Sequence, residues 1–167
     1  TADSITLEVT RNGSGDCWLQ FSPAFSLRTH VLGVQVNGKQ AAFKMQANSS
    51  DQHMNLRVPL SEGSTRLVFR MKDDFGLSLT NQLPDLGGAS RGLRVTNESW
   101  DAGRTQLTLD ASGLAGARYE MGIWNASQIS SVDGASVSKS GKLEITMPPG
   151  PADSYVQQRI VLHFARP

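Results

Sequence analysis

Hydrophobic and polar side chains alternate with a period of two along most of this chain. Near the N-terminus, positions 5, 7 and 9 are apolar and positions 6, 8 and 10 are polar. The same alternation recurs in short runs bounded by Gly, Asn, Asp, Ser or Pro, at 17–21, 32–36, 54–60, 67–71, 107–109, 119–123, 143–147 and 160–164. A period of two places one face of a strand in a core and the other in water. The pattern predicts an all-β fold of antiparallel sheets packed in pairs as sandwiches.

One tight turn is signalled strongly. Leu32, Val34 and Val36 form an apolar row that leads directly into Asn37-Gly38, and apolar residues return at 42–43. Asn-Gly between two such runs favours a two-residue hairpin turn, because both positions tolerate a positive φ. We therefore expect a hairpin centred on residues 37–38.

The alternation stops at residues 80–90 (TNQLPDLGGAS) and then starts again, which is typical of a linker or a long crossover. Four segments recur in the same order on either side of it: 7–10 with 93–96, 36–38 with 132–134, 55–63 with 142–150, and 66–71 with 159–164. We predict two similar antiparallel immunoglobulin-like β-sandwiches in tandem, at 1–80 and 91–167, joined by a linker at 81–90. One continuous sandwich of about twelve strands is the alternative.

Composition and net charge exclude several classes of binding partner and of structure. The 167 residues include sixteen basic and fifteen acidic side chains, a net charge of +1, which offers no electrostatic footprint for nucleic acid. No apolar run approaches the roughly 20 residues of a membrane-spanning helix, so we expect no membrane insertion. Cys17 is the single cysteine, which excludes an internal disulfide and leaves the redox compartment open.

Catalytic and metal-binding patterns are weak. His30, His53 and His163 are expected at solvated positions, and no nucleophile elbow, zinc motif or phosphate-binding loop accompanies them. The acidic pair Asp73-Asp74 consists of neighbours, which point to opposite faces of a strand. Neither this pair nor residues 48–51 resembles a complete calcium loop. We expect no cofactor, no metal and no catalysis, with a carboxylate-based hydrolase as one alternative.

The three tryptophans are the best candidates for a ligand or interface site. Trp18, Trp100 and Trp124 are each out of phase with the apolar row of their own strand, so unbroken strands would point all three indoles away from the cores. Three outcomes stay open: a stacking platform for sugar rings, burial against another domain, or a β-bulge that returns the ring to the core. Polar partners of a sugar would be Gln20, Glu98, Asp101 or Asn125.

The strand order, the V-x-V-N-G hairpin (34–38), the G-S-T-R-L-V-F strand (63–69) and the G-L-R-V restart (92–95) together resemble tandem β-sandwich accessory modules of bacterial secreted multidomain proteins, many of them carbohydrate-active or surface-associated. That resemblance covers the whole chain and implies a non-catalytic accessory role and a periplasmic or extracellular location. We therefore expect an interaction module that packs against or presents a neighbouring domain, or binds another protein. The alternative is a carbohydrate-binding module that uses exposed tryptophans.

Overall fold

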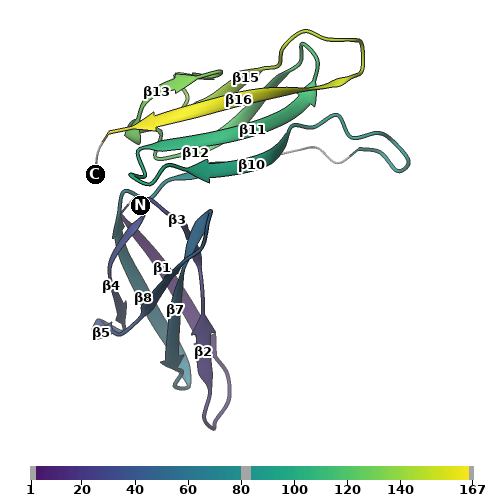
Figure 1. The fold of residues 1–167 in the computed structure, drawn as a ribbon. Coiled ribbons are helices and arrows are strands. Elements are labelled where there is room, and N and C mark those ends of the chain that lie inside the picture. The colour runs from purple at the N-terminus through teal and green to yellow at the C-terminus, as the bar shows by residue number, and fades with distance from the viewer. Residues whose placement is uncertain (1–2, 80–83, 166–167) are drawn as a thin grey trace. The chain divides into compact units, whose positions relative to one another are not determined.

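The computed structural model describes residues 3–79 and 84–165 (Figure 1). The chain divides into two compact units, Thr1–Asp74 and Phe75–Pro167. In the described residues, every strand belongs to one of four antiparallel sheets of four strands each. The prediction of an all-β fold is confirmed.

The first unit contains eight strands among its described residues: β1 (Ser4–Arg11), β2 (Trp18–Phe21), β3 (Ala24–Ser26), β4 (His30–Val36), β5 (Lys39–Ala41), β6 (Lys44–Ala47), β7 (Asp51–Pro59) and β8 (Gly63–Lys72). One sheet has the order β1-β8-β4-β5, and the other joins β2, β3 and β6 to β7. A single hydrophobic core is built mainly from alternate residues of β7 and β8: Met54, Leu56, Val58, Leu67, Phe69 and Met71. Buried residues thus alternate with more exposed ones along these two strands, as the period of two in the sequence predicts.

The β7 strand is only partly covered along one edge. Strands β2 and β3 pair with β7 in one continuous register and are separated by Ser22 and Pro23. Proline has no N–H to donate to a ladder, which fits the break at that point. On the opposite edge β6 pairs only with residues 52–55 of β7. Residues 56–59 have no strand on that edge in the described part of the chain.

The predicted hairpin is present, but one residue of its apolar row is misplaced. Asn37 and Gly38 both have positive φ, 48° and 78°, and Asn37 Oδ1 accepts a hydrogen bond from the Arg66 N–H at 2.8 Å. Val34 is buried, whereas Leu32 is 63% exposed. The register with β8 shifts between Val31 and Gly33, so Leu32 occupies a β-bulge. The expectation that Leu32 faces the core is therefore wrong, because the bulge changes the phase of alternation.

The second unit contains the strands β9 (Gly76–Ser78), β10 (Arg94–Trp100), β11 (Gln106–Leu114), β12 (Arg118–Trp124), β13 (Ile129–Asp133), β14 (Ser136–Val137), β15 (Lys142–Thr146) and β16 (Tyr155–Phe164), and the 3-10 helix η1 (Ala126–Gln128), among its described residues. Its sheets have the orders β10-β11-β16-β13 and β14-β15-β12-β9. Its core is a second cluster of buried residues, to which β11, β15 and β16 contribute most. No residue belongs to both clusters.

The two units use four corresponding strand pairings. In the first unit β1 and β4 flank β8. Strands β2 and β3 lie along one edge of β7, and β6 lies along its other edge. In the second unit β11 and β13 flank β16, while β12 and β14 flank β15. These strands follow the same order along each half of the chain. The second unit adds β9 and β10 at sheet edges, and the first adds β5.

The predicted linker at 81–90 lies partly outside the described residues, which begin again at 84. Residues 84–93 form turns and irregular backbone without a strand. The division between the units falls earlier, after Asp74. Among the described residues, no helix combines the length and apolar character needed to cross a membrane.

Candidate functional site

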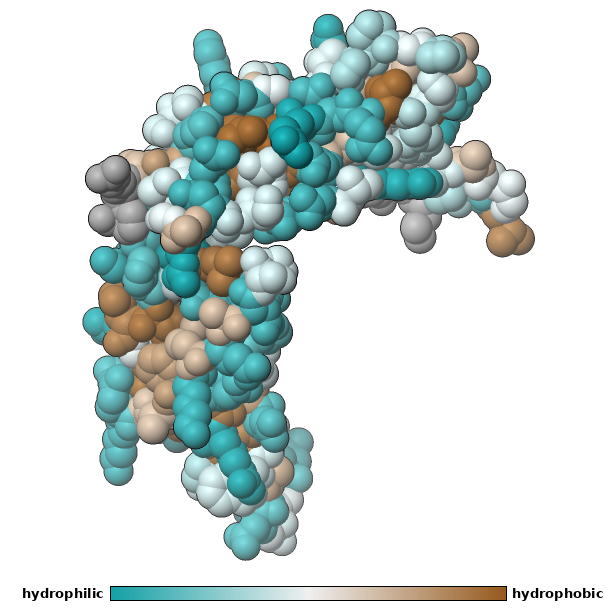
Figure 2. Space-filling view, in the orientation of Figure 1, coloured by the Kyte–Doolittle hydropathy of each residue, from teal (hydrophilic) through white to brown (hydrophobic). Residues whose placement is uncertain are grey.

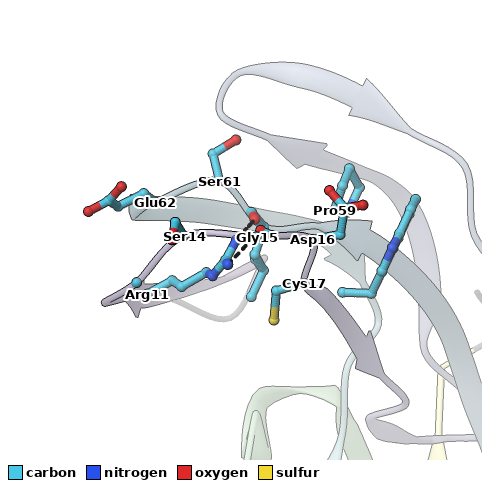
Figure 3. A pocket seen from close by; sticks show the side chains of 11 residues that line it. Arg11, Ser14, Gly15, Asp16, Cys17, Pro59, Ser61 and Glu62 are labelled. Atoms are coloured by element: carbon cyan, nitrogen blue, oxygen red, sulfur yellow. Dashed lines mark hydrogen bonds between the residues drawn. The ribbon is translucent and has the colours of Figure 1, made fainter.

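A cavity of about 500 Å³ lies at one end of the first unit and carries Trp18 on its wall (Figure 3). The segment that joins β1 to β2 forms one side, and the end of β7 with the turn into β8 forms the other. Its lining residues are Arg11, Gly13, Ser14, Gly15, Asp16, Cys17, Trp18, Pro59, Leu60, Ser61 and Glu62. Two segments that are distant in sequence therefore meet at this cavity.

Arg11 ties the two sides together. Its guanidinium donates one hydrogen bond to the Leu60 carbonyl at 2.7 Å and another to the Gly15 carbonyl at 2.6 Å, drawn as dashed lines in Figure 3. Gly15 has a φ of +99°, a conformation that residues with a Cβ rarely adopt. The Leu60 N–H donates to the Cys17 carbonyl at 2.9 Å, which extends the β2–β7 ladder to the cavity. The walls are thus held by charged and backbone hydrogen bonds.

Trp18 is the main aromatic surface of this cavity. It is 53% exposed, as the period-two pattern predicts for a residue facing away from the core. The guanidinium of Arg57 lies over the indole, 4.6 Å from the ring centroid. A cation at this distance is attracted to the π face of the ring. Arg57 is absent from the cavity lining, so the ring has Arg57 on one side and borders the cavity with another part of its surface.

The polar groups of the cavity are mostly oxygen acceptors. Asp16 and Glu62 contribute carboxylates, and Ser14 and Ser61 contribute hydroxyls. Figure 3 shows Asp16 beside Pro59 and Glu62 at the opposite end of the view. Both acidic residues are exposed. A two-carboxylate hydrolase needs one member of its pair in an apolar setting, whereas both of these side chains are exposed.

A second hollow, of about 390 Å³, lies on the other side of Arg57. It is lined by Gln20, Ala42, Phe43, Lys44, Asn55, Leu56 and Arg57. Gln20 lies opposite Arg57 across β2 and β7, and Lys44 lies opposite Asn55 across β6 and β7. We call this hollow the basic groove, because Lys44 and Arg57 are its charged residues.

Trp100 does not face away from its core, as it would on an unbroken strand. The β10–β11 register shifts between Val95 and Asn97, and Trp100 pairs with the buried Leu107. Its indole packs against Phe75 and Phe164, with ring centroids 6.2 and 5.2 Å away. The β-bulge named as the third outcome in the sequence analysis is therefore the arrangement at this residue. The indole Nε1 is buried and has no hydrogen-bond partner among the described residues.

Trp124 is 49% exposed at the end of β12, where it pairs with Gly76 of β9. Trp18 and Trp124 thus belong to different units, and Trp100 packs on a core. The polar candidates also separate: Gln20 lines the basic groove, whereas Glu98, Asp101 and Asn125 lie in the second unit. No single patch within either unit joins two exposed indoles.

The histidines pair with carboxylates on the surface. His30 lies 3.4 Å from Asp73, His53 lies 3.2 Å from Asp51, and His163 lies 2.9 Å from Asp133. No group of three or more potential ligands among His, Cys, Asp and Glu could hold a metal ion in the described part of the chain.

Sequence reasoning missed Arg11, Asp16 and Arg57. The Gly-Ser-Gly-Asp run at 13–16, which ends two residues before Trp18, was a local signal for Asp16 and for a loop beside the indole. No local signal could identify Arg57, because the β2–β7 pairing joins residues nearly forty positions apart.

On the face shown in Figure 2, hydrophilic side chains cover most of both units, with hydrophobic areas between them. Within the first unit, Trp18 is singled out by its cavity and by the guanidinium of Arg57 over its ring. Comparison with known protein families, with curated proteins and with solved structures finds no match to this chain.

Proposed function

We propose that this chain is a non-catalytic accessory module of a larger secreted protein and that its first unit binds a carbohydrate at the Trp18 cavity. The observation that supports the proposal is the combination of a half-exposed indole, braced by Arg57, with a cavity of oxygen acceptors. The C–H face of a sugar ring is apolar and suits the negative face of an indole. The hydroxyls at its rim would donate to Asp16, Glu62 and backbone carbonyls.

The presence of two similar units in one chain is consistent with the proposed accessory role. We infer that they are copies of one immunoglobulin-like sandwich, because corresponding strands make the same four pairings in the same order. The paired registers support aligning ITLEVT (5–10) with LTLDAS (107–112), since Leu7 lies opposite Leu67 and Leu109 lies opposite Ile160. We therefore propose that β11, rather than β10, corresponds to β1. This alignment differs from that of 7–10 with 93–96.

A binding experiment with one matched control tests the sugar site. Soluble polysaccharides are titrated into the full chain, and dissociation constants are measured by calorimetry and by indole fluorescence. We expect Trp18→Ala to weaken binding at least about tenfold, or about 1.4 kcal/mol, because the stacking surface is lost. Trp124→Ala, which removes the other half-exposed indole, should leave binding unchanged.

Circular dichroism would establish that both variants fold. Loss of binding in Trp124→Ala but not in Trp18→Ala would move the site to the second unit. The absence of binding across a broad panel of glycans would contradict the proposal.

A further inference from the structure

The basic groove beside Trp18 has a charge opposite to that of the cavity. Its seven lining residues include two cations, Lys44 and Arg57, and no carboxylate. The cavity on the other side of Trp18 includes the carboxylates of Asp16 and Glu62. The only cation there, Arg11, is engaged by two backbone carbonyls. A ligand that crosses both hollows therefore meets acceptors at one end and positive charge at the other.

The two cations of the groove lie close enough to share one anion. Lys44 pairs with Asn55 across the β6–β7 ladder, and Arg57 follows Asn55 on the same face of β7. Such diagonal neighbours are separated by roughly 7–8 Å, which is within reach of two long side chains. Neither cation forms an ion pair with a carboxylate in residues 3–79 or 84–165. Both charges are therefore available to a ligand.

The cavity and the groove meet at the Trp18–Arg57 contact. Trp18 lines the cavity, Arg57 lines the groove, and the guanidinium lies 4.6 Å from the ring centroid. Two amides extend the groove beyond this contact, at Gln20 and Asn55. Asn55 Oδ1 accepts a hydrogen bond from the Ser22 hydroxyl, which directs the amide nitrogen of Asn55 to donate elsewhere. These donors match hydroxyl and carboxylate oxygens along a chain of sugars.

We propose that the ligand is an acidic oligosaccharide, with a neutral sugar stacked on Trp18 and a carboxylate-bearing sugar held in the basic groove by Lys44 and Arg57. This inference rests on the carbohydrate-binding function proposed above and specifies its ligand class. Hydrogen bonds between a carboxylate and ammonium or guanidinium groups are stronger than those between neutral groups, so they would favour the acidic sugar over its neutral counterpart. An acidic peptide along the uncovered edge of β7 would use the charges but not the indole, which is why the glycan is the better fit.

The test compares each acidic ligand with its own neutral form on the full chain. The probes are oligosaccharides of hyaluronan and of polygalacturonate, their carboxyl-reduced derivatives, and a poly-glutamate peptide as the non-sugar acid. We expect at least one acidic oligosaccharide to bind about tenfold more tightly than its reduced form at low salt. The preference should shrink as salt is raised, because screening weakens exposed ion pairs.

The variants separate charge from stacking. Lys44→Gln should remove most of the preference for the acidic form and leave binding of the reduced form unchanged. Lys39→Gln is the matched control, because Lys39 is an exposed lysine on β5, in the other sheet of the same unit. Trp18→Ala should weaken both forms to the same extent.

Three other results would overturn one or both proposals. Equal binding of acidic and reduced forms would overturn this inference and leave the carbohydrate-binding proposal intact. Poly-glutamate binding that Lys44→Gln weakens and Trp18→Ala does not would identify a peptide surface and overturn the glycan assignment. Failure of every oligosaccharide in this set and of the wider glycan panel would remove both proposals.

Discussion

At the scale of single residues, Asp101 organises the turn that follows β10. Its Oδ1 accepts hydrogen bonds from the N–H groups of Thr105 and Gln106, both at 2.7 Å, and its Oδ2 accepts one from the Thr105 hydroxyl. Burial alone would raise the pKa of this carboxyl, and it is the largest single influence, but the hydrogen bonds together lower the pKa below its ordinary value of 3.8. Asp101, which the sequence analysis named among the possible polar partners of a sugar, has a structural role in this turn.

Protonation of the Asp101 carboxylate and its replacement by Ala should therefore weaken the same hydrogen bonds in this turn. A lowered folded-state pKa means that the stabilisation is complete above about pH 4 and is lost as the pH falls through the folded-state value. Asp101→Ala should reduce the free energy of unfolding at pH 7 by about 1 kcal/mol, because the turn is solvated and its charge is screened.

The difference between wild type and Asp101→Ala should shrink below about pH 4. Urea unfolding monitored at pH 7, 4 and 3 would measure it. A difference that stays constant over this range would contradict the role of the ionised carboxylate.

At the scale of elements, two β-bulges decide which side chains are exposed. The bulge in β4 places Leu32 in solvent, and the bulge in β10 places Trp100 on the core. Each bulge adds one unpaired residue, so every side chain beyond it changes face relative to unbroken alternation. A bulge thus exposes Leu32 on β4, and another bulge buries the indole of Trp100 on β10.

Changing the number of residues in β10 tests this account. Deletion of Thr96 should remove the bulge and leave Trp100 opposite Leu107, because the residues on either side then pair in one unbroken register. Insertion of one Ala between Glu98 and Ser99 should instead turn Trp100 outward and reduce the stability of the second unit by about 2–4 kcal/mol, somewhat less than a fully buried Trp→Ala substitution. Thr96→Ala is the control, because it keeps the residue count and loses only the hydroxyl bond to the Asp110 carbonyl.

Indole emission in a Trp18→Phe, Trp124→Phe background would report Trp100 alone. A red shift in the insertion variant, but not in the deletion variant or in Thr96→Ala, is the expected result. Unchanged emission in the insertion variant, or a red shift in the deletion variant, would show that the phase of the strand does not orient the ring.

At the scale of the whole molecule, stability resides in two hydrophobic clusters with no common residue. Leu67 on β8 and Leu162 on β16 are both fully buried, one in each cluster. Because each cluster is packed separately, a cavity made in one cluster should first destabilise the strands that enclose that cluster.

Core truncations should therefore have effects confined to one unit. Leu67→Ala should cost about 2–5 kcal/mol and speed amide hydrogen exchange across β1–β8, with little change across β10–β16. Leu162→Ala should produce the reverse pattern. Hydrogen-exchange mass spectrometry would measure both, and faster exchange throughout the chain in either variant would indicate a single cooperative unit instead.

Much of the fold could be predicted because alternation is a local signal. Leu56 and Val58, and likewise Leu67 and Phe69, were assigned to the core from their spacing and are buried. The Asn37-Gly38 turn was predictable for the same local reason, since both residues adopt positive φ. The likeness of 5–10 to 107–112, which supports the proposed correspondence of β1 with β11, was also present in the sequence, but the sequence analysis aligned 7–10 with 93–96 instead.

The candidate site was less predictable. Exposure of Trp18 followed from its phase, whereas its cavity depends on a loop that Arg11 fastens to the turn after β7. Arg57 reaches Trp18 only because β2 pairs with β7 in one particular register. Register is decided by the packing of both strands on the core, which no short stretch of sequence specifies.

The sequence alone determined the all-β class, the two faces of most strands and the hairpin at residues 37–38, because these depend on neighbours one or two positions away. The tertiary structure alone decided the bulges at Leu32 and before Trp100, the guanidinium over Trp18 and the opposite charges of the two hollows. Each of these depends on how one strand is aligned against another. That alignment is set by the packing of side chains that are distant in the chain, so it emerges only when both sheets enclose the core.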